Sequence, residues 1–218
     1  MDYLVQQNRC VASGEPESSE RIHARGKRVM IIGGGDTGAD CLGTCLRQKA
    51  ESMAQLEIMP KPPPTRDKST PWPMWPYRLR TSSSHEEGGT RQWSVLTKEF
   101  LGTDSVLSGM RGVSVKWENS VDGRMVFQEI PDSGFEDSVD LVLLAMGFTG
   151  DGNAKVLSEF GIKTDLKGMA ILDEKKMSSV SGIFVAGDLS KGASLVVRAI
   201  ADGRAAAEGM NSSLSEHQ

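Results

Sequence analysis

A short apolar run followed at once by a glycine-rich turn constrains the fold of this chain more than any other feature. Residues Val29–Ile32 are all apolar, Gly33–Gly38 reads GGGDTG, and Asp36–Lys49 carries apolar side chains at helical spacing. An apolar run without alternation indicates a strand covered on both faces, as in a parallel sheet. A second strand is expected at Ser52–Met59. The sequence therefore predicts a βαβ unit within an α/β fold built on a Rossmann-like parallel sheet.

The three spaced glycines of the turn form a G-x-G-x-x-G pattern with a physical reason for each position. Gly33 permits the tight turn after the strand, Gly35 lets the main chain approach a pyrophosphate, and Gly38 lets the helix pack closely on the strand. The free N–H groups and the dipole at the helix start favour phosphate charge. The pattern favours dinucleotide binding, and a purely structural bend is the alternative.

Glu57 is the candidate for recognising the adenosine ribose. It lies 19 residues after Gly38 (57 − 38), near the offset expected for an acid that binds the ribose hydroxyls. A carboxylate there would repel a 2′-phosphate, which favours NAD over NADP. Lys61 and Arg66 follow closely and could instead pair with such a phosphate, and Glu57 could simply be an exposed strand end.

The rest of the chain divides into a polar N-terminal extension, a proline-rich excursion, a hairpin and a C-terminal α/β segment. Residues 1–25 carry few apolar anchors, and ordered structure is expected to begin at Gly26. Residues 60–76 hold too many prolines for a central strand or a helix interior. The further expected elements are hairpin strands at 113–118 and 125–130, a strand at 141–145, a helix at 153–161, strands at 169–172 and 183–186, a helix at 194–210 and a frayed tail at 211–218.

A second motif lies in the C-terminal third of the chain. The apolar stretch Ile183–Ala186 ends in Gly187-Asp188, and a helix is expected from Ser194. An acid at a strand end can accept hydrogen bonds from polyol hydroxyls, and the helix start would face electron-rich ligand atoms. An Asp that only makes a turn is the equally weighted alternative.

Composition excludes several classes of protein. The net charge is −4, from 25 basic and 29 acidic residues, so no broad basic surface for nucleic acid is indicated. No apolar run approaches the ~20 residues that span a bilayer, and no signal peptide is evident, so a soluble cytoplasmic protein is expected. Three cysteines and three histidines are too few for an iron–sulfur cluster held by this chain alone. Cys41 and Cys45, four apart, are expected to be buried thiols rather than metal ligands.

Five segments in order resemble one family: GGGDTG, PWPMWP, SSSHEEGG, LLAMGF and GIFVAGD. Together they are similar to the small (β) subunit of glutamate synthase, from about Tyr3 to about Gly209. The glycine and AGD motifs are common to two-dinucleotide-fold flavoproteins, whereas the tryptophan–proline and HEEGG segments are particular to this family. The resemblance implies a cytoplasmic oxidoreductase of nitrogen assimilation and amino-acid biosynthesis, with an organelle as the alternative location if the source is a eukaryote. In this family NAD(P)H reduces FAD, and electrons pass through iron–sulfur centres to the large (α) subunit, where 2-oxoglutarate and glutamine-derived ammonia become glutamate.

The resemblance also implies roles for individual residues and no catalytic residue or metal ligand, because hydride transfer between two cofactors depends on proximity and orientation. The implied cofactor contacts are the NAD(P) pyrophosphate at Gly33, Gly34, Gly35, Asp36, Thr37 and Gly38, the nicotinamide at Met146 and Gly147, the ribityl-phosphate part of FAD at Gly187 and Asp188, and the flavin ring at Ser194, Leu195 and Val196. The implied domains are an extension (1–25), an NAD(P)H-binding Rossmann domain (26–147), a C-terminal segment of the FAD domain (148–210) and a flexible tail (211–218).

The chain departs from the family pattern at its N-terminal side. The family has cysteine clusters and a first, FAD-binding G-x-G-x-x-G, and neither occurs here. The expectation is a fragment, or a protein completed by another polypeptide, that binds a nicotinamide nucleotide, holds FAD weakly or not at all, and is catalytically incomplete. Two alternatives stay open: a subunit of another NAD(P)H-dependent flavin oxidoreductase, and a catalytically inactive nucleotide-binding module.

Two further segments each have a structural and a functional interpretation. His85-Glu86-Glu87 is expected to be a solvated loop or a contact with another subunit or domain. Trp72, Trp75 and Trp93 are expected to pack the proline-rich excursion onto the sheet rather than to stack on a ligand.

Overall fold

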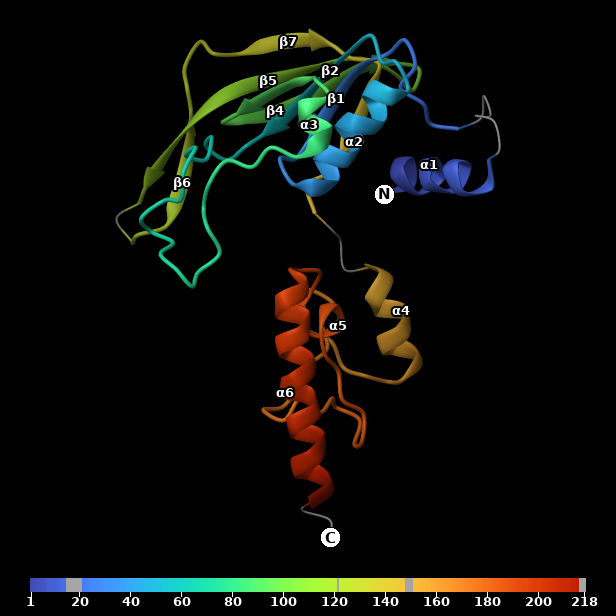
Figure 1. Cartoon of the computed structure of the whole chain (residues 1–218), viewed down its shortest axis with the longest axis vertical. Coiled ribbons are helices and arrows are strands. Elements are labelled where there is room, and N and C mark those ends of the chain that lie inside the picture. The colour runs from blue at the N-terminus through green and yellow to red at the C-terminus, as the bar shows by residue number, and fades with distance from the viewer. Residues whose placement is uncertain (15–20, 121, 148–150, 216–218) are drawn as a thin grey trace. The chain divides into compact units, whose positions relative to one another are not determined.

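The computed structural model describes residues 1–14, 21–120, 122–147 and 151–215, and they form two compact units. The first unit spans Met1–Met146 and the second spans Gly147–Gln218. Each unit has its own buried core. Figure 1 labels the helices and strands of both.

A four-stranded parallel sheet forms the centre of the first unit, which confirms the predicted α/β fold class. Its strands lie in the order β3 (Thr90–Trp93), β2 (Ser52–Glu57), β1 (Arg28–Ile32) and β8 (Leu141–Leu144), and every neighbouring pair is parallel. Helix α2 (Asp36–Arg47) connects β1 to β2, as the βαβ prediction requires.

The buried residues of β1 explain its unbroken apolar sequence. Val29 and Ile31 pack with Leu42 of α2 on one face of the sheet. Met30 packs with Val95 and with other residues of the antiparallel strands described next. Since successive side chains of a strand point to opposite faces, both faces of the sheet are covered.

An antiparallel insertion follows β3. It consists of β4 (Val95–Thr103), β5 (Val106–Asn119), β6 (Met125–Glu129) and β7 (Phe135–Ser138), with β5 paired to the other three. The β5–β6 pair confirms the predicted hairpin. Trp117 packs against the tilted ring of Phe127, at 5.3 Å between ring centroids, and donates a 2.7 Å hydrogen bond from Nε1 to the carbonyl of Ile58, just after β2.

The N-terminal helix α1 (Asp2–Ser13) corrects the expectation that ordered structure begins at Gly26. Tyr3 is buried, and its hydroxyl donates to Oε1 of Gln48 at 3.0 Å. The same oxygen accepts the N–H of Ala24 at 2.8 Å. A few well-placed anchors therefore fix this segment, although its composition is polar.

The second unit contains α4 (Asp151–Glu159), α5 (Asp188–Lys191) and α6 (Val196–Ser215). The strands expected at 169–172 and 183–186 are absent as strands from its described residues, where only single antiparallel bridges occur, such as Thr164–Ala170 and Met177–Phe184. The expected frayed tail is also wrong in part, because α6 continues to Ser215. At Gly209 of this helix a Cβ would lie 1.9 Å from the carbonyl oxygen of Lys175, so α6 packs closely on that turn.

Candidate functional site

The carboxyl ends of the four parallel strands lie along one edge of the sheet. The glycine turn follows β1, Glu57 ends β2, Trp93 ends β3, and Met146 lies two residues after β8. β1 lies between β2, the next strand in the chain, and β8, the last strand to join the sheet. Such a switch in strand order, at the carboxyl edge, is where open α/β sheets bind ligands.

The three spaced glycines of the turn differ in what requires them. A Cβ at Gly33, whose φ is 125°, would lie 2.1 Å from the carbonyl oxygen of Ala145. A Cβ at Gly38 would lie 2.3 Å from the carbonyl oxygen of Gly33 and 2.4 Å from Nε2 of Gln55. Gly35 has nothing within 4 Å of its Cβ position, and it has an ordinary negative φ of −83°. Packing among the described residues thus requires Gly33 and Gly38, while the space above Gly35 is open.

The first turn of α2 begins beside this open space. Gly35 is the N-cap of the helix, and no side chain in the described part of the chain caps it. Gly35 and Asp36 are exposed and Thr37 is half-buried. The first backbone N–H groups of a helix need acceptors from outside it and carry partial positive charge, so an anion fits here.

Gln55 and Glu57 hold the turn from β2. The Gly34 N–H donates to Oε2 of Glu57 at 2.6 Å, and Nε2 of Gln55 donates to the carbonyl oxygen of Gly33 at 2.7 Å. The other oxygen of Glu57 accepts the Met59 N–H at 3.0 Å. The amide of Gly34, assigned to the pyrophosphate from the sequence, therefore already has an acceptor in Glu57.

Gln55, which is only 2% exposed, was not predicted from the sequence as a site residue. Its signal was a polar side chain within the otherwise apolar run 53–56 of β2. Its Oε1 lies 2.8 Å from Nε2 of His85. On the other side of the imidazole, the Ser82 N–H donates to Nδ1 at 3.2 Å. Burial, and then the charge of Arg91, lower the pKa of His85, so the ring is neutral at pH 7.

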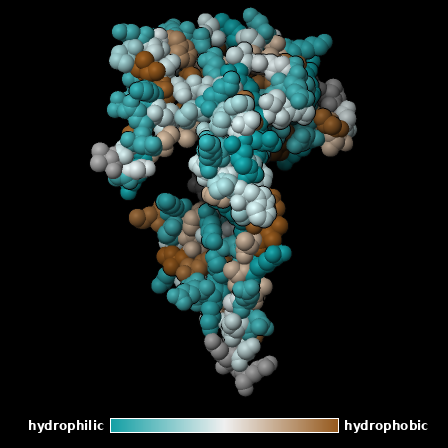
Figure 2. Space-filling model, turned by 60° about the vertical axis from the view of Figure 1, so that its left-hand side comes forward, coloured by the Kyte–Doolittle hydropathy of each residue, from teal (hydrophilic) through white to brown (hydrophobic). Residues whose placement is uncertain are grey.

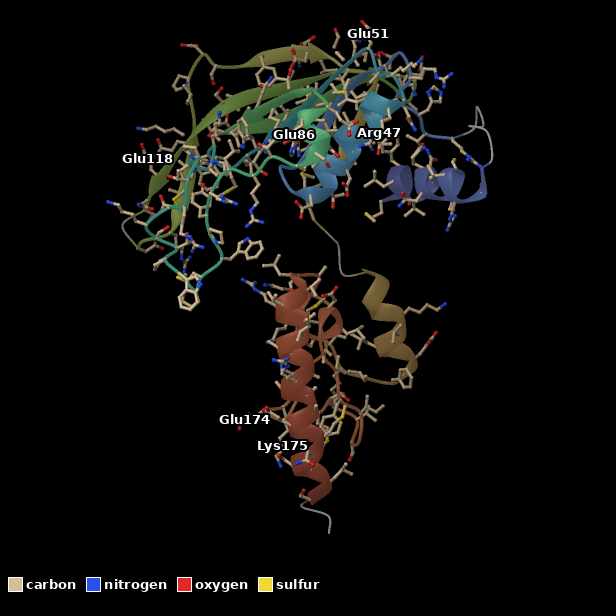
Figure 3. All side chains as sticks on the ribbon, viewed as in Figure 1. Arg47, Glu51, Glu86, Glu118, Glu174 and Lys175 are labelled. Atoms are coloured by element: carbon tan, nitrogen blue, oxygen red, sulfur yellow. The ribbon has the colours of Figure 1, made fainter. Side chains whose placement is uncertain are left out.

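His85 belongs to the short helix α3 (Ser83–Glu86), which packs on α2. Figure 3 labels Glu86 on α3 and Arg47 on α2. Ser84 is buried against Gly43, where a Cβ would lie 2.7 Å from the Ser84 hydroxyl oxygen. The expectation that His85-Glu86-Glu87 is a solvated or intersubunit segment is therefore wrong for His85, which binds within its own unit.

Trp93 lies beside Glu57 in the β2–β3 register. Nζ of Lys61 lies 4.9 Å and the guanidinium carbon of Arg91 5.0 Å from the centre of its ring. Arg66 instead donates to the carbonyls of Thr70 and Met74 within the proline-rich excursion. Lys61 and Arg66 were the two cations that the sequence offered as partners for a 2′-phosphate. Of these, Lys61 lies against Trp93, the neighbour of Glu57 on β3.

Trp72 and Trp75 do not pack on the sheet. They are 84% and 60% exposed, so the expectation that they pack the excursion down is wrong for both. The guanidinium carbon of Arg80 lies 4.2 Å from the ring centre of Trp75. The excursion carries these rings outward because its prolines give it no ladder hydrogen bonds with which to join the sheet.

The second unit organises its own motif around the buried carboxylate of Asp202, which was not predicted from the sequence. Asp202 on α6 accepts the Gly187 N–H at 3.0 Å, Nζ of Lys176 at 2.6 Å, Nζ of Lys191 at 2.8 Å, and the Ser190 hydroxyl. Burial acts to raise the pKa of Asp202, but these hydrogen bonds outweigh it and leave the pKa below its ordinary value. No local sequence signal marks this residue, because its partners lie outside α6.

A pocket of about 420 Å³ lies over this carboxylate and is lined by residues that include Gly187, Lys191, Ser194 and Arg198. Asp188 begins α5, and Ser194 and Leu195 immediately precede α6, whose first residue is Val196. Apolar side chains reach the surface of this unit (Figure 2), and those near the start of α6 are Leu195, Val196, Val197 and Ile200.

The cysteines lie in the core rather than in a site. Cys10, Cys41 and Cys45 are all buried. Burial, and then the neighbouring Cys45, raise the pKa of Cys41 to about 11. Within the described ranges there is no group of three or more His, Cys, Asp or Glu side chains arranged to hold a metal ion, and no helix there is long and apolar enough to cross a membrane.

Comparisons with known proteins agree with this fold. The family described as "Pyridine nucleotide-disulphide oxidoreductase" matches residues 106–203. Among solved structures, FprA from Mycobacterium tuberculosis in complex with NADPH covers 88% of this chain at a TM-score of 0.64 and 12% identity, and the chain spans 54% of it. Thioredoxin reductase from T. acidophilum covers 87% at a TM-score of 0.52 and 22% identity, and the chain spans 53% of it. At these identities the likeness concerns the fold alone.

Sequence relatives match nearly the whole chain, among them two glutamate synthase proteins. The glutamate synthase [NADPH] small chain of Mycobacterium tuberculosis is 48% identical over 211 residues, which is 95% of this chain and 42% of the relative. The glutamate synthase [NADH] of Saccharomyces cerevisiae is 38% identical over 208 residues, which is 90% of this chain and 10% of the relative. The chain thus spans less than half the length of these two relatives.

Proposed function

Because this chain is a homologue of glutamate synthase small chains, we propose that it is the NAD(P)H-binding, electron-input part of a glutamate synthase-type flavoprotein oxidoreductase. The observation that supports this most directly is the glycine turn. It is held in place from β2, sits at the switch in strand order, and is open above Gly35.

The turn and the start of α2 would hold the pyrophosphate. The backbone around Gly35, Asp36, Thr37 and Gly38 would supply donors, because no side chain of the described part caps this helix. Gly33 shapes the turn, and Gly34 contributes by keeping Glu57 in position. Met146 and Gly147, which follow β8, would lie near the nicotinamide. The bound nucleotide would supply a hydride for FAD, so the residues of this chain need only position it.

Glu57 would read the adenosine ribose, and we infer a preference for NADH. Its carboxylate is fixed at the end of β2 and would repel a 2′-phosphate. Two cations that would favour a 2′-phosphate, Lys61 and Arg91, both sit against Trp93, one strand away from Glu57. The relatives carry both names, [NADPH] in Mycobacterium tuberculosis and [NADH] in yeast. The fixed carboxylate is the reason for favouring NADH in this chain.

The second unit would contribute to a flavin site in the complete protein. Gly187 and Asp188 would face the ribityl-phosphate part of FAD, and Ser194, Leu195 and Val196 would face the flavin ring. These 218 residues contain no second G-x-G-x-x-G for the pyrophosphate of FAD. The polypeptide studied alone is therefore expected to hold FAD weakly, and glutamate formation would require the rest of the small chain and the large subunit.

Titration of the purified chain with NADH and NADPH tests the proposal. Calorimetry should show one saturable site, tighter for NADH, and quenching of tryptophan fluorescence should follow the same curve because Trp93 lies at this edge. Absence of binding of either nucleotide at millimolar concentration would contradict the proposed function. Stoichiometric FAD in the purified chain, seen by visible absorbance, would contradict the weak flavin binding alone.

A further inference from the structure

The segment Ser82–Gly89 (SSSHEEGG) is occupied within its own unit. Ser84 packs on Gly43 of α2, and a Cβ at Gly89 would lie 2.9 Å from Cδ1 of Leu42. Glu87 pairs with Arg47, also on α2. These contacts hold α3 against α2 and place the His85 imidazole over β2, where it reaches Gln55.

We propose that His85 is a positioning residue of the nucleotide site: it orients the amide of Gln55, which in turn fixes the peptide between Gly33 and Gly34. The inference rests on the proposed function of the glycine turn as the nucleotide site. It assigns the histidine of the segment a role in ligand affinity that it exerts through Gln55, without contact with the nucleotide.

The hydrogen bonds run in one consistent direction. The Ser82 N–H donates to Nδ1 of His85, so Nδ1 is the acceptor and the neutral ring carries its proton on Nε2. Nε2–H then donates to Oε1 of Gln55 at 2.8 Å. The Gln55 NH₂ group is left to donate to the Gly33 carbonyl at 2.7 Å.

Gln55 needs this support because its amide can be turned over. A rotation of about 180° exchanges its oxygen and nitrogen, and the oxygen would then face the carbonyl oxygen of Gly33. Because Gln55 is only 2% exposed, hydrogen bonds to water do little to favour one orientation of its amide over the other. His85 as a donor selects the orientation that binds the turn.

The fixed peptide matters because the turn is built of residues with great backbone freedom. Gly33, Gly34 and Gly35 would each sample many conformations if unsupported. One peptide plane is held at its carbonyl by Gln55 and at its N–H by Glu57. Ordering the turn before the ligand arrives lowers the entropy cost of binding, so loss of the His85–Gln55 contact should appear as lost affinity.

The test is a double-mutant cycle on NADH affinity in the full chain. His85→Leu and Gln55→Leu should each raise the Kd for NADH about fivefold, the equivalent of one hydrogen bond. The double variant should match a single one, whereas independent residues would give roughly 25-fold. His85→Gln, which keeps a donor toward Gln55, should recover most of the affinity, and Glu86→Gln on the exposed side of α3 should change nothing.

All titrations are made at a temperature where thermal melts show every variant folded, so a loss of stability does not enter the Kd. NMR of the wild-type imidazole should show the Nε2–H tautomer. Single variants within twofold of the wild type, additive effects, or the Nδ1–H tautomer would each overturn the inference while leaving the proposed function intact. A wild-type chain that binds no nucleotide would overturn both.

Discussion

Gln55 and Glu57 hold opposite ends of one peptide group, the one that joins Gly33 to Gly34. Alternate residues of a strand point to the same side, so one strand supplies both contacts. Within the turn that they hold, Gly33 and Gly38 are needed for the packing of the chain itself, whereas Gly35 leaves room for a ligand.

Gly38→Ala should therefore lower mainly the stability of the chain, and Gly35→Ala mainly its affinity for NADH. Gly38→Ala places a Cβ against Gly33 and Gln55 and should destabilise the chain by about 2 kcal/mol. Gly35→Ala meets nothing within 4 Å and should cost less than about 1 kcal/mol, yet raise the Kd for NADH roughly tenfold by obstructing the pyrophosphate. Urea unfolding and calorimetric titration measure the two quantities. Equal affinity of Gly35→Ala and the wild type would argue against a phosphate at this turn.

Glu57→Gln should weaken NADH binding about tenfold, because its NH₂ group would face a backbone donor at Gly34 or Met59 and its charge is lost. NADPH binding should change less, since removal of the carboxylate relieves repulsion of the 2′-phosphate. Glu57→Arg should shift the preference to NADPH. Glu51→Gln, which removes an equal charge from an exposed residue just before β2, is the matched control. An unchanged ratio of the two Kd values would mean that another residue reads the ribose.

Asp202→Asn should destabilise the second unit by about 2 kcal/mol at pH 7, since charged donors lose a buried acceptor. Because the pKa of Asp202 is lowered in the folded chain, the stabilisation by its carboxylate is complete above the unfolded-state pKa of about 3.9. It is lost as the pH falls from there through the folded-state pKa. Urea unfolding of wild type and variant should thus differ at pH 7 and converge in acid. Glu208→Gln, exposed on the same helix, should behave like the wild type at both pH values.

The three thiols should be unreactive in the folded chain. They are buried, and the pKa of Cys41 is raised to about 11, so little thiolate forms at pH 8. Labelling with a disulfide reagent should proceed at the rate of unfolding and reach all three cysteines in denaturant. One cysteine that reacts as fast as a free thiol in the native chain would contradict the burial.

The elements predicted well from the sequence are those whose signals are local. The β1–α2–β2 unit follows from an apolar run, three spaced glycines and a helical pattern within thirty residues, and the β5–β6 hairpin follows from its turn residues. The contacts that organise the site are not local. Gln55 and His85 lie 30 residues apart, and neither sequence neighbourhood indicates the other.

Other features that were not predicted from the sequence also depend on contacts between residues far apart in the chain. Tyr3 fixes α1 through Gln48, 45 residues away, and Asp202 binds Gly187 from a helix whose own sequence gives no hint of the contact. Trp72 and Trp75 were expected to pack the excursion onto the sheet, but both are exposed, because the prolines of the excursion have no N–H to donate to a strand. A polar residue inside an apolar strand, such as Gln55, is the one local signal that could have been used.

The fastening of the Gly33–Gly34 peptide also bears on the speed of the proposed cofactor exchange. The carbonyl and the N–H of this peptide are both hydrogen-bonded to β2 before any nucleotide is present. The turn therefore needs no conformational change before the nucleotide binds. Association should then be limited by encounter and orientation, and a crystal soaked with nucleotide should superimpose on an unsoaked one along this stretch. Oxidised and reduced nucleotide would exchange without a change in the conformation of this turn.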